Sequence, residues 1–113
     1  MAMLDMLKML GKFKEMQSKV EEMQNNLVNI VAEGEAGGGM VVAKANGKKQ
    51  LIWLQIEKNL LQSEDVEILQ DLIVAAVNKA LENAEQQAKS YLQKQAQGLL
   101  PHLSGIDLGN LMK

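Results

Sequence analysis

Few residues in this chain have side chains suited to catalysis, and they are scattered along it. His102 is the only histidine, and no residue near it in the sequence predicts the buried, oriented setting that a catalytic base needs. The acidic pairs Glu21–Glu22 and Glu64–Asp65 are typical of solvated helix surface and of charge at a helix end. Cysteine is absent and no metal-ligand spacing is present. We therefore expect no enzyme activity, metal, cofactor or small-molecule substrate.

A glycine cluster at Gly34 and Gly37–Gly39 could be interpreted as a phosphate cradle. A nucleotide-binding loop of that kind would require a Gly-Lys-Ser/Thr sequence that opens a helix, whereas an apolar strand-like segment follows here. The cluster is more typical of a turn that lets two strands cross or approach closely.

Lysine is the only strong cation in the chain, because arginine is absent. The lysines on the two long helices predicted below are Lys8, Lys12, Lys14, Lys19, Lys79, Lys89 and Lys94. Spacing alone favours ordinary solvated surface, since Glu15, Glu21 and Glu22 interrupt the first group. Bidentate reading of guanine normally uses arginine, so any DNA binding would depend on lysine and phosphate, with modest sequence specificity.

The formal charge is −2, but it is unevenly distributed. Residues 1–20 carry four lysines against two acids, and residues 44–58 carry four against one. Residues 59–85 contain six acids and a single lysine. The net sign argues against a nucleic-acid partner, while the local basic segments leave such a partner possible.

The elements that must position these lysines begin with one long helix, predicted over residues 3–32. Met6, Phe13, Val20 and Leu27 lie seven apart, and Met9, Met16, Met23 and Ile30 repeat the spacing with an offset of three. A helix of roughly 43 Å cannot bury this seam inside a single small domain, so a partner helix is expected. Two weaker alternatives are a membrane-surface helix and a methionine-rich groove for peptides.

Three short antiparallel strands are expected next, at residues 31–37, 40–45 and 50–56. The Asn46–Gly47 pair predicts a hairpin, because both residue types tolerate positive φ. The last strand carries Ile52 and Leu54 on one face and Trp53 on the other. Apolar residues on both faces favour a strand that is central or covered by helices.

A second long helix is predicted from about Asp65 to Gln97. Ser63, Glu64 and Asp65 provide candidates for its N-cap. Its apolar stripe becomes alanine-rich between positions 76 and 88, which lets a neighbour approach closely or leaves the helix partly free.

Gly98 and Pro101 should end the second helix. We therefore expect one domain over residues 1–97, followed by a loosely ordered tail over residues 98–113. No apolar run approaches the ~18 residues needed to span a bilayer, and cysteine is absent. We expect a cytoplasmic protein without a membrane partner.

Three stretches together resemble the YbaB/EbfC family of nucleoid-associated DNA-binding proteins. They are KEMQSKVEEMQ at 14–24, GEAGGGMV at 34–41 followed by Asn46–Gly47 and Ile56, and DLIVAAVNKA at 71–80. The resemblance covers residues 13–97 and rests on the order and spacing of the stretches. It implies an α+β fold with a long N-terminal helix, a three-stranded antiparallel sheet and a long C-terminal helix. It also implies a tweezer-like homodimer that binds DNA in the nucleoid, without catalysis.

These inferences combine into a prediction of lysine contacts to the phosphates of double-stranded DNA, with a role in chromosome organisation or gene regulation. We expect the DNA contacts at Lys8, Lys12, Lys14, Lys19, Lys89 and Lys94. We expect the dimer or core seam to contain Phe13, Met16, Val20, Met23, Leu27, Ile52, Trp53 and Leu54. The alternative is a homodimeric protein-interaction module that uses the methionine-rich helix seam without binding DNA.

Overall fold

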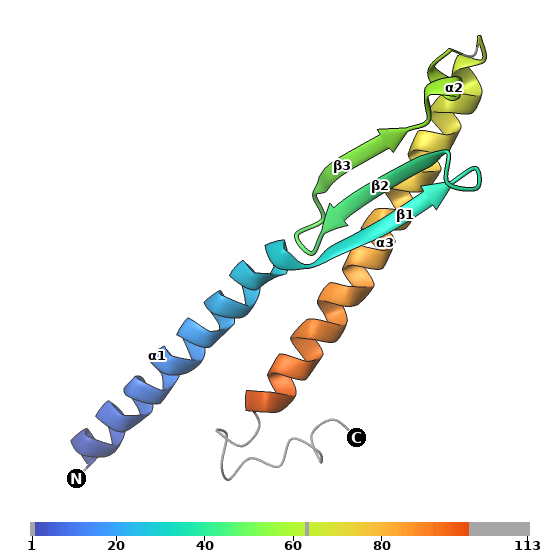
Figure 1. The fold of residues 1–113 in the computed structure, drawn as a ribbon. Coiled ribbons are helices and arrows are strands. Elements are labelled where there is room, and N and C mark those ends of the chain that lie inside the picture. Colours follow the sequence, from blue (N-terminus) through green and yellow to red (C-terminus); the bar gives the residue numbers. More distant parts are fainter. Residues whose placement is uncertain (1, 63, 100–113) are drawn as a thin grey trace.

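A computed structural model describes residues 2–62 and 64–99 of the chain, and the side chains of residues 2–62 and 64–98. The elements are α1 (Ala2–Asn26), the short 3₁₀ helix η1 (Leu27–Asn29), β1 (Val31–Ala36), β2 (Val41–Asn46), β3 (Leu51–Ile56), α2 (Lys58–Leu61) and α3 (Val66–Leu99). Figure 1 shows an elongated molecule, 77 Å in its longest dimension, in which the sheet lies at the middle. The predicted α+β fold with two long helices and a three-stranded sheet is confirmed.

The sheet is an antiparallel meander in the order β1-β2-β3. Glu33, Lys44 and Trp53 lie opposite one another across the three strands. The expectation that the 50–56 strand is central or covered was wrong, because β2 is central and β3 is an edge strand. Helix α3 packs on β1 and β2 and barely contacts β3, so residues of β3 stay exposed on both faces.

The core lies between α3 and one face of β1 and β2. The alanine stripe of α3 is buried there, with Ala76, Ala80 and Ala84 fully inaccessible to solvent. Gly34 of β1 makes this close packing possible, because a Cβ at that position would lie 2.2 Å from the backbone nitrogen of Ala80. Small residues on both surfaces therefore let the helix backbone approach the strand backbone.

The two hairpin turns differ in how well the sequence predicts them. Gly37, Gly38 and Gly39 all have positive φ and form the β1–β2 turn, which confirms the interpretation of the glycine cluster. In the β2–β3 hairpin, positive φ occurs at Lys49 instead of at the predicted Asn46–Gly47 pair. Asn46 remains in β2, where its side-chain oxygen accepts hydrogen bonds from the backbone N–H groups of residues 48 and 50.

The helix ends also depart from the sequence-based bounds. Helix α1 ends at Asn26 instead of residue 32, because η1 and the extended Ile30 turn the chain into β1, whose Val31 is opposite Asn46. Asp65 is confirmed as a cap of α3, since its side chain accepts a hydrogen bond from the backbone N–H of Ile68. Helix α3 continues to residue 99. The predicted tail lies outside the described residues from position 100 onward, as does Ser63.

Candidate functional site

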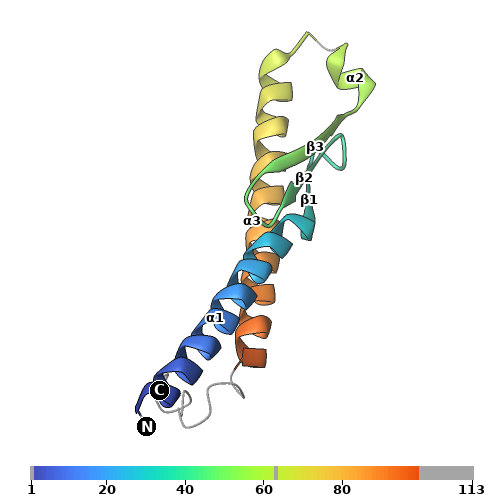
Figure 2. The ribbon, with the colours of Figure 1, turned by 90° about the vertical axis from the view of Figure 1, so that its left-hand side faces the viewer.

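Two helical segments extend together from one end of the sheet, and we call them the arms. The α1 arm is the whole of α1, and the α3 arm is residues 89–99 of α3. No residue of α1 is buried. Figures 1 and 2 show both segments running from the sheet toward the same end of the molecule. The arms carry all six lysines that the sequence predicted as DNA contacts.

Three of the α1 lysines share one face of the helix. At 3.6 residues per turn, Lys8, Lys12 and Lys19 lie within roughly 40° of one another around the axis. Lys14 lies on nearly the opposite side. Glu15 and Glu22 lie beside Lys19 on this face, whereas Asp5 is the one acid in its outer half, which carries Lys8 and Lys12. The net positive charge of the face is therefore confined to the half of α1 nearer its free end. All four lysines are exposed.

The α3 lysines are not brought together on one face. Lys89 and Lys94 are five residues apart, which separates them by roughly 140° around the helix axis. Lys94 follows Tyr91 by three residues and so lies near the side of α3 that faces α1. Lys89 lies on the other side. Both are exposed to solvent.

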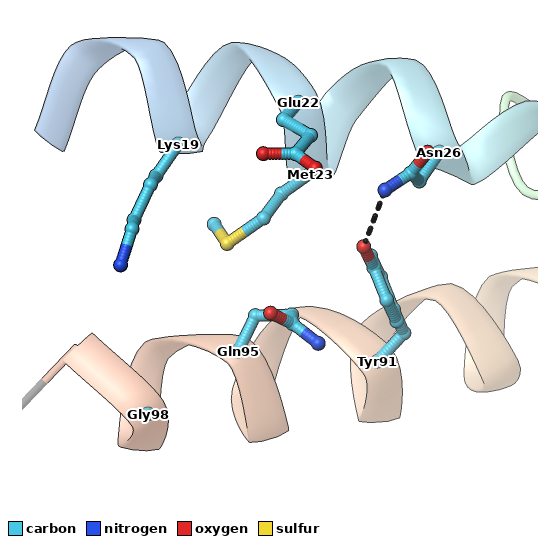
Figure 3. Close-up of a pocket in the computed structure, with 7 residues that line it drawn as sticks. All are labelled: Lys19, Glu22, Met23, Asn26, Tyr91, Gln95 and Gly98. Carbon is cyan, nitrogen blue, oxygen red and sulfur yellow. Dashed lines mark hydrogen bonds between the residues drawn. The ribbon is translucent and has the colours of Figure 1, made fainter. Parts of the chain in front are cut away.

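A pocket of about 340 Å³ lies between the basal half of the α1 arm and the α3 arm. Its lining residues are Lys19, Glu22, Met23, Asn26, Tyr91, Gln95 and Gly98. Figure 3 shows Asn26 and Tyr91 joined at one end of the pocket, where the Asn26 Nδ2 donates a hydrogen bond of 3.2 Å to the Tyr91 hydroxyl oxygen. Of the predicted DNA contacts, only Lys19 lines this pocket, with its side chain extending toward α3.

The lysines of the arms are free of ion pairs within the described part of the chain. The salt bridges there join Lys44 to Glu33 at 3.7 Å and Lys49 to Glu85 at 3.9 Å. Exposed acids gather near the other end of the molecule, around α2 and the first turns of α3, and include Glu64, Glu67 and Asp71. The arms therefore present unpaired ammonium groups at a distance from this acidic end.

The predicted seam residues form two uncovered apolar surfaces. On α1, Phe13 is 62% exposed and Val20 is 41% exposed, while Met16, Met23 and Leu27 are partly buried. Phe13 also lines an apolar groove of about 320 Å³ with Met6, Met9 and Leu10. Leu27 lies in η1, beyond the end of α1, so the expectation that it continues the long helix was wrong, while its place in a dimer or core seam stays a prediction.

The second apolar surface lies on β3, where Ile52, Trp53 and Leu54 are each more than a third exposed. The Lys44 ammonium lies 4.6 Å from the centre of the Trp53 ring, a cation–π arrangement that covers one face of the indole. The sequence therefore located apolar residues that this single chain does not bury.

The sequence reasoning missed the contact that joins the arms. Tyr91 could have been singled out, because it continues the alanine stripe three residues after Ala88 and is the only tyrosine. Nothing in the sequence indicates its pairing with Asn26, which is 65 residues away.

Other candidate sites receive no support from the described residues. Residues 2–62 and 64–99 contain no group of three acids or histidines that could hold a metal ion. Over the same residues, no helix has the length and apolar character needed to cross a bilayer. His102 lies outside the described residues.

Comparisons with known proteins relate the whole helix–sheet–helix unit to one family. A protein of Chlorobaculum tepidum, named as a nucleoid-associated protein, is 46% identical over 100 residues and 88% of each chain. One of Agrobacterium fabrum with the same description is 44% identical over 86% of this chain and 91% of its own. The crystal structure of an uncharacterised Helicobacter pylori protein superposes with a TM-score of 0.65 at 25% identity, over 78% of this chain and 92% of that one. The model of the YbaB/EbfC DNA-binding family matches residues 1–99, and the chain therefore belongs to that family.

Proposed function

We propose that this protein is a nucleoid-associated protein that binds double-stranded DNA, mainly through contacts between lysines and backbone phosphates. The observation that carries the proposal is the alignment of Lys8, Lys12 and Lys19 on one face of a projecting helix that buries none of its residues. Membership of a DNA-binding family over residues 1–99 supports the same conclusion. The role we propose is chromosome organisation or gene regulation at the nucleoid, in the cytoplasm and without catalysis.

The proposed contacts differ in what they do. Lys8, Lys12 and Lys19 follow one stretch of DNA backbone, because they span roughly 16 Å along the helix and each strand carries one phosphate per ~3.4 Å of the duplex axis. Lys94 approaches from the α3 side. Lys14 and Lys89, on other faces of their helices, add to the positive field around the arms. Contacts of this kind position a protein on DNA and carry little sequence information.

The proposed protein is a homodimer that places two pairs of arms around the duplex in a tweezer-like arrangement. Support comes from β3, an edge strand on which Ile52, Trp53 and Leu54 each stay more than a third exposed in this single chain. An exposed apolar edge strand is a site where another chain adds on. The α1 seam around Phe13 and Val20 provides further apolar surface that a second protomer could contact in the proposed dimer.

Fluorescence anisotropy on a labelled duplex of random sequence, at two salt concentrations, tests the proposal. We expect a dissociation constant in the micromolar range or below. A plot of the logarithm of the association constant against the logarithm of salt concentration should have a slope of about −0.9 per phosphate neutralised. The rival function is a homodimeric protein-interaction module that uses the exposed α1 seam and does not bind DNA. Absence of salt-sensitive duplex binding would favour this rival and reject the DNA proposal.

A further inference from the structure

The α1 arm is attached to the rest of the molecule through very few contacts. No α1 residue is buried, and the chain at its base passes through η1 into β1. Gly47, in the β2–β3 hairpin, fixes this base by donating its N–H to the carbonyl oxygens of Leu27, at 2.9 Å, and Ile30, at 3.1 Å. A Cβ at position 47 would lie 2.5 Å from the Leu27 oxygen, so the hairpin touches the base of the arm backbone to backbone.

The Gly47 contacts tie the base of the arm to the sheet, but they do not tie it to α3, so the angle between the two arms needs a further contact at the base. The hydrogen bond from Asn26 to Tyr91 provides it. Among the hydrogen bonds of the described residues, it is the one that joins α1 directly to α3. Tyr91 is well placed for this role, since it follows the buried stripe that holds α3 against the sheet and is itself partly buried.

Beyond this bond the two arms are separated by the pocket. Lys19 and Met23 extend from α1, and Gln95 and Gly98 lie on the α3 side, with no hydrogen bond between the two groups in Figure 3. Gly98 contributes no side chain to fill the space. The hydrogen bond from Asn26 to Tyr91 is therefore the direct polar link across this gap among the described residues.

We propose that Asn26 and Tyr91 are positioning residues that set the separation of the two arms, and thereby the spacing of the lysines offered to DNA. The inference rests on the proposed function and deepens it by naming what fixes the binding geometry. Neither residue needs to contact DNA. Losing one hydrogen bond leaves the buried contact between α3 and the sheet intact, while the arms sample wider separations. Only a fraction of the molecules then has the arm spacing that binds DNA, and the apparent affinity is the full affinity multiplied by that fraction.

Tyr91→Phe in the full chain removes the hydroxyl and changes neither charge nor ring volume. We expect duplex affinity to fall about fivefold, the effect of one hydrogen bond. The urea unfolding midpoint, followed by the fluorescence of Trp53, should fall only slightly, because the buried packing of α3 on the sheet is retained. Asn26→Ala removes the same bond from the other side and provides a second variant should Tyr91→Phe fold poorly. Gln95→Ala is the matched control, since it lines the pocket without bonding to α1.

Distances between the arms are measured separately by pulsed EPR. The chain has no cysteine, so Gln17→Cys and Gln93→Cys, both at exposed positions, take spin labels only where intended. Dilution with unlabelled protein restricts the measurement to one chain. We expect a longer and broader distribution in Tyr91→Phe and in Asn26→Ala, and no further change in the double variant.

The two proposals fail in different ways. A parent protein that does not bind duplex rejects the proposed function, whatever the EPR distances show. A parent that binds, with Tyr91→Phe matching it in both distance distribution and affinity, overturns the positioning role alone. Additive effects of Asn26→Ala and Tyr91→Phe would also overturn it, because the two residues would then act through separate contacts.

Discussion

Gly34 and Ala80 show how single residues fix the position of the longer helix. The backbone of α3 passes where a side chain at position 34 would otherwise be, with the Ala80 nitrogen 2.2 Å and the Ala76 oxygen 2.5 Å from a Cβ built there. Glycine in a strand is a known sign of a close backbone approach, so the sequence indicates that some neighbour comes near. It does not indicate which helix that neighbour is, because the partner lies more than 40 residues away.

Gly34→Ala should lower the free energy of unfolding by about 3 kcal/mol or more, because the strand or the helix must shift to admit the methyl group. Urea unfolding followed by tryptophan fluorescence measures this change. Gly11→Ala is the control, since nothing lies within 4 Å of a Cβ at that helical position. We expect that substitution to stabilise the protein, or its α1 arm, by up to about 1 kcal/mol. Equal effects of the two substitutions would contradict the packing argument.

The lysines also show that the sequence does not indicate which distant element lies beside a residue. Their helical spacing already places Lys8, Lys12 and Lys19 on a common face. Which side of α1 faces α3 follows only from the pairing of Asn26 with Tyr91. Periodicity along a chain describes one helix at a time, whereas a site formed by two helices depends on a contact that is distant in sequence.

At the scale of elements, β3 is the strand whose environment the sequence misjudged. Its apolar residues on both faces are typical of a covered strand, and within this chain it is an uncovered edge. Apolar residues on both faces of a strand indicate that both faces become covered. They do not indicate whether the same chain or a second chain covers them. The C-terminal end of α1 departs from the prediction for a related reason, since the pairing of Val31 with Asn46 in the sheet overrides the heptad pattern.

Ile52→Lys tests the proposed dimer at β3. Residue 52 lies beside the irregularity in the β2–β3 register and is 49% exposed, so a lysine there does not disturb the core of the single chain. Light scattering at micromolar concentration should report a dimer for the parent and a monomer for the variant. Val74→Lys, at a 58% exposed position on α3, is the control and should remain dimeric. A dimeric Ile52→Lys protein would place the interface elsewhere.

The whole molecule is polarised along its length. Lysine-bearing arms lie at one end, and α2 with the acidic start of α3 lies at the other, in a body 77 Å long (Figure 1). Uneven charge along the sequence predicts that such segments exist. Their separation in space follows from the antiparallel path of α3, which carries its acidic first turns away from the arms and its final turns back toward α1.

A pair of double-charge changes tests this polarity. Lys8→Glu with Lys12→Glu alters the arm, while Lys48→Glu with Lys58→Glu makes the same net charge change outside it. We expect the arm variant to weaken duplex binding strongly and to reduce the salt slope by about one per lysine removed. The second variant should bind nearly as the parent does. Anisotropy titrations at several salt concentrations give both quantities, and equal losses in the two variants would mean that only total charge matters.

The nearly free α1 helix has a mechanical consequence. Its 25 residues form a lever about 37 Å long, pivoted at its base. A swing of about 10° at the pivot moves the tip by roughly 6 Å, close to the rise of two base pairs along the duplex axis. A displacement of a few tenths of an ångström beside Tyr91 is thus magnified severalfold at Lys8. In the proposed DNA complex, a small change at this contact would therefore redirect the lysines at the tip while the sheet stays in place.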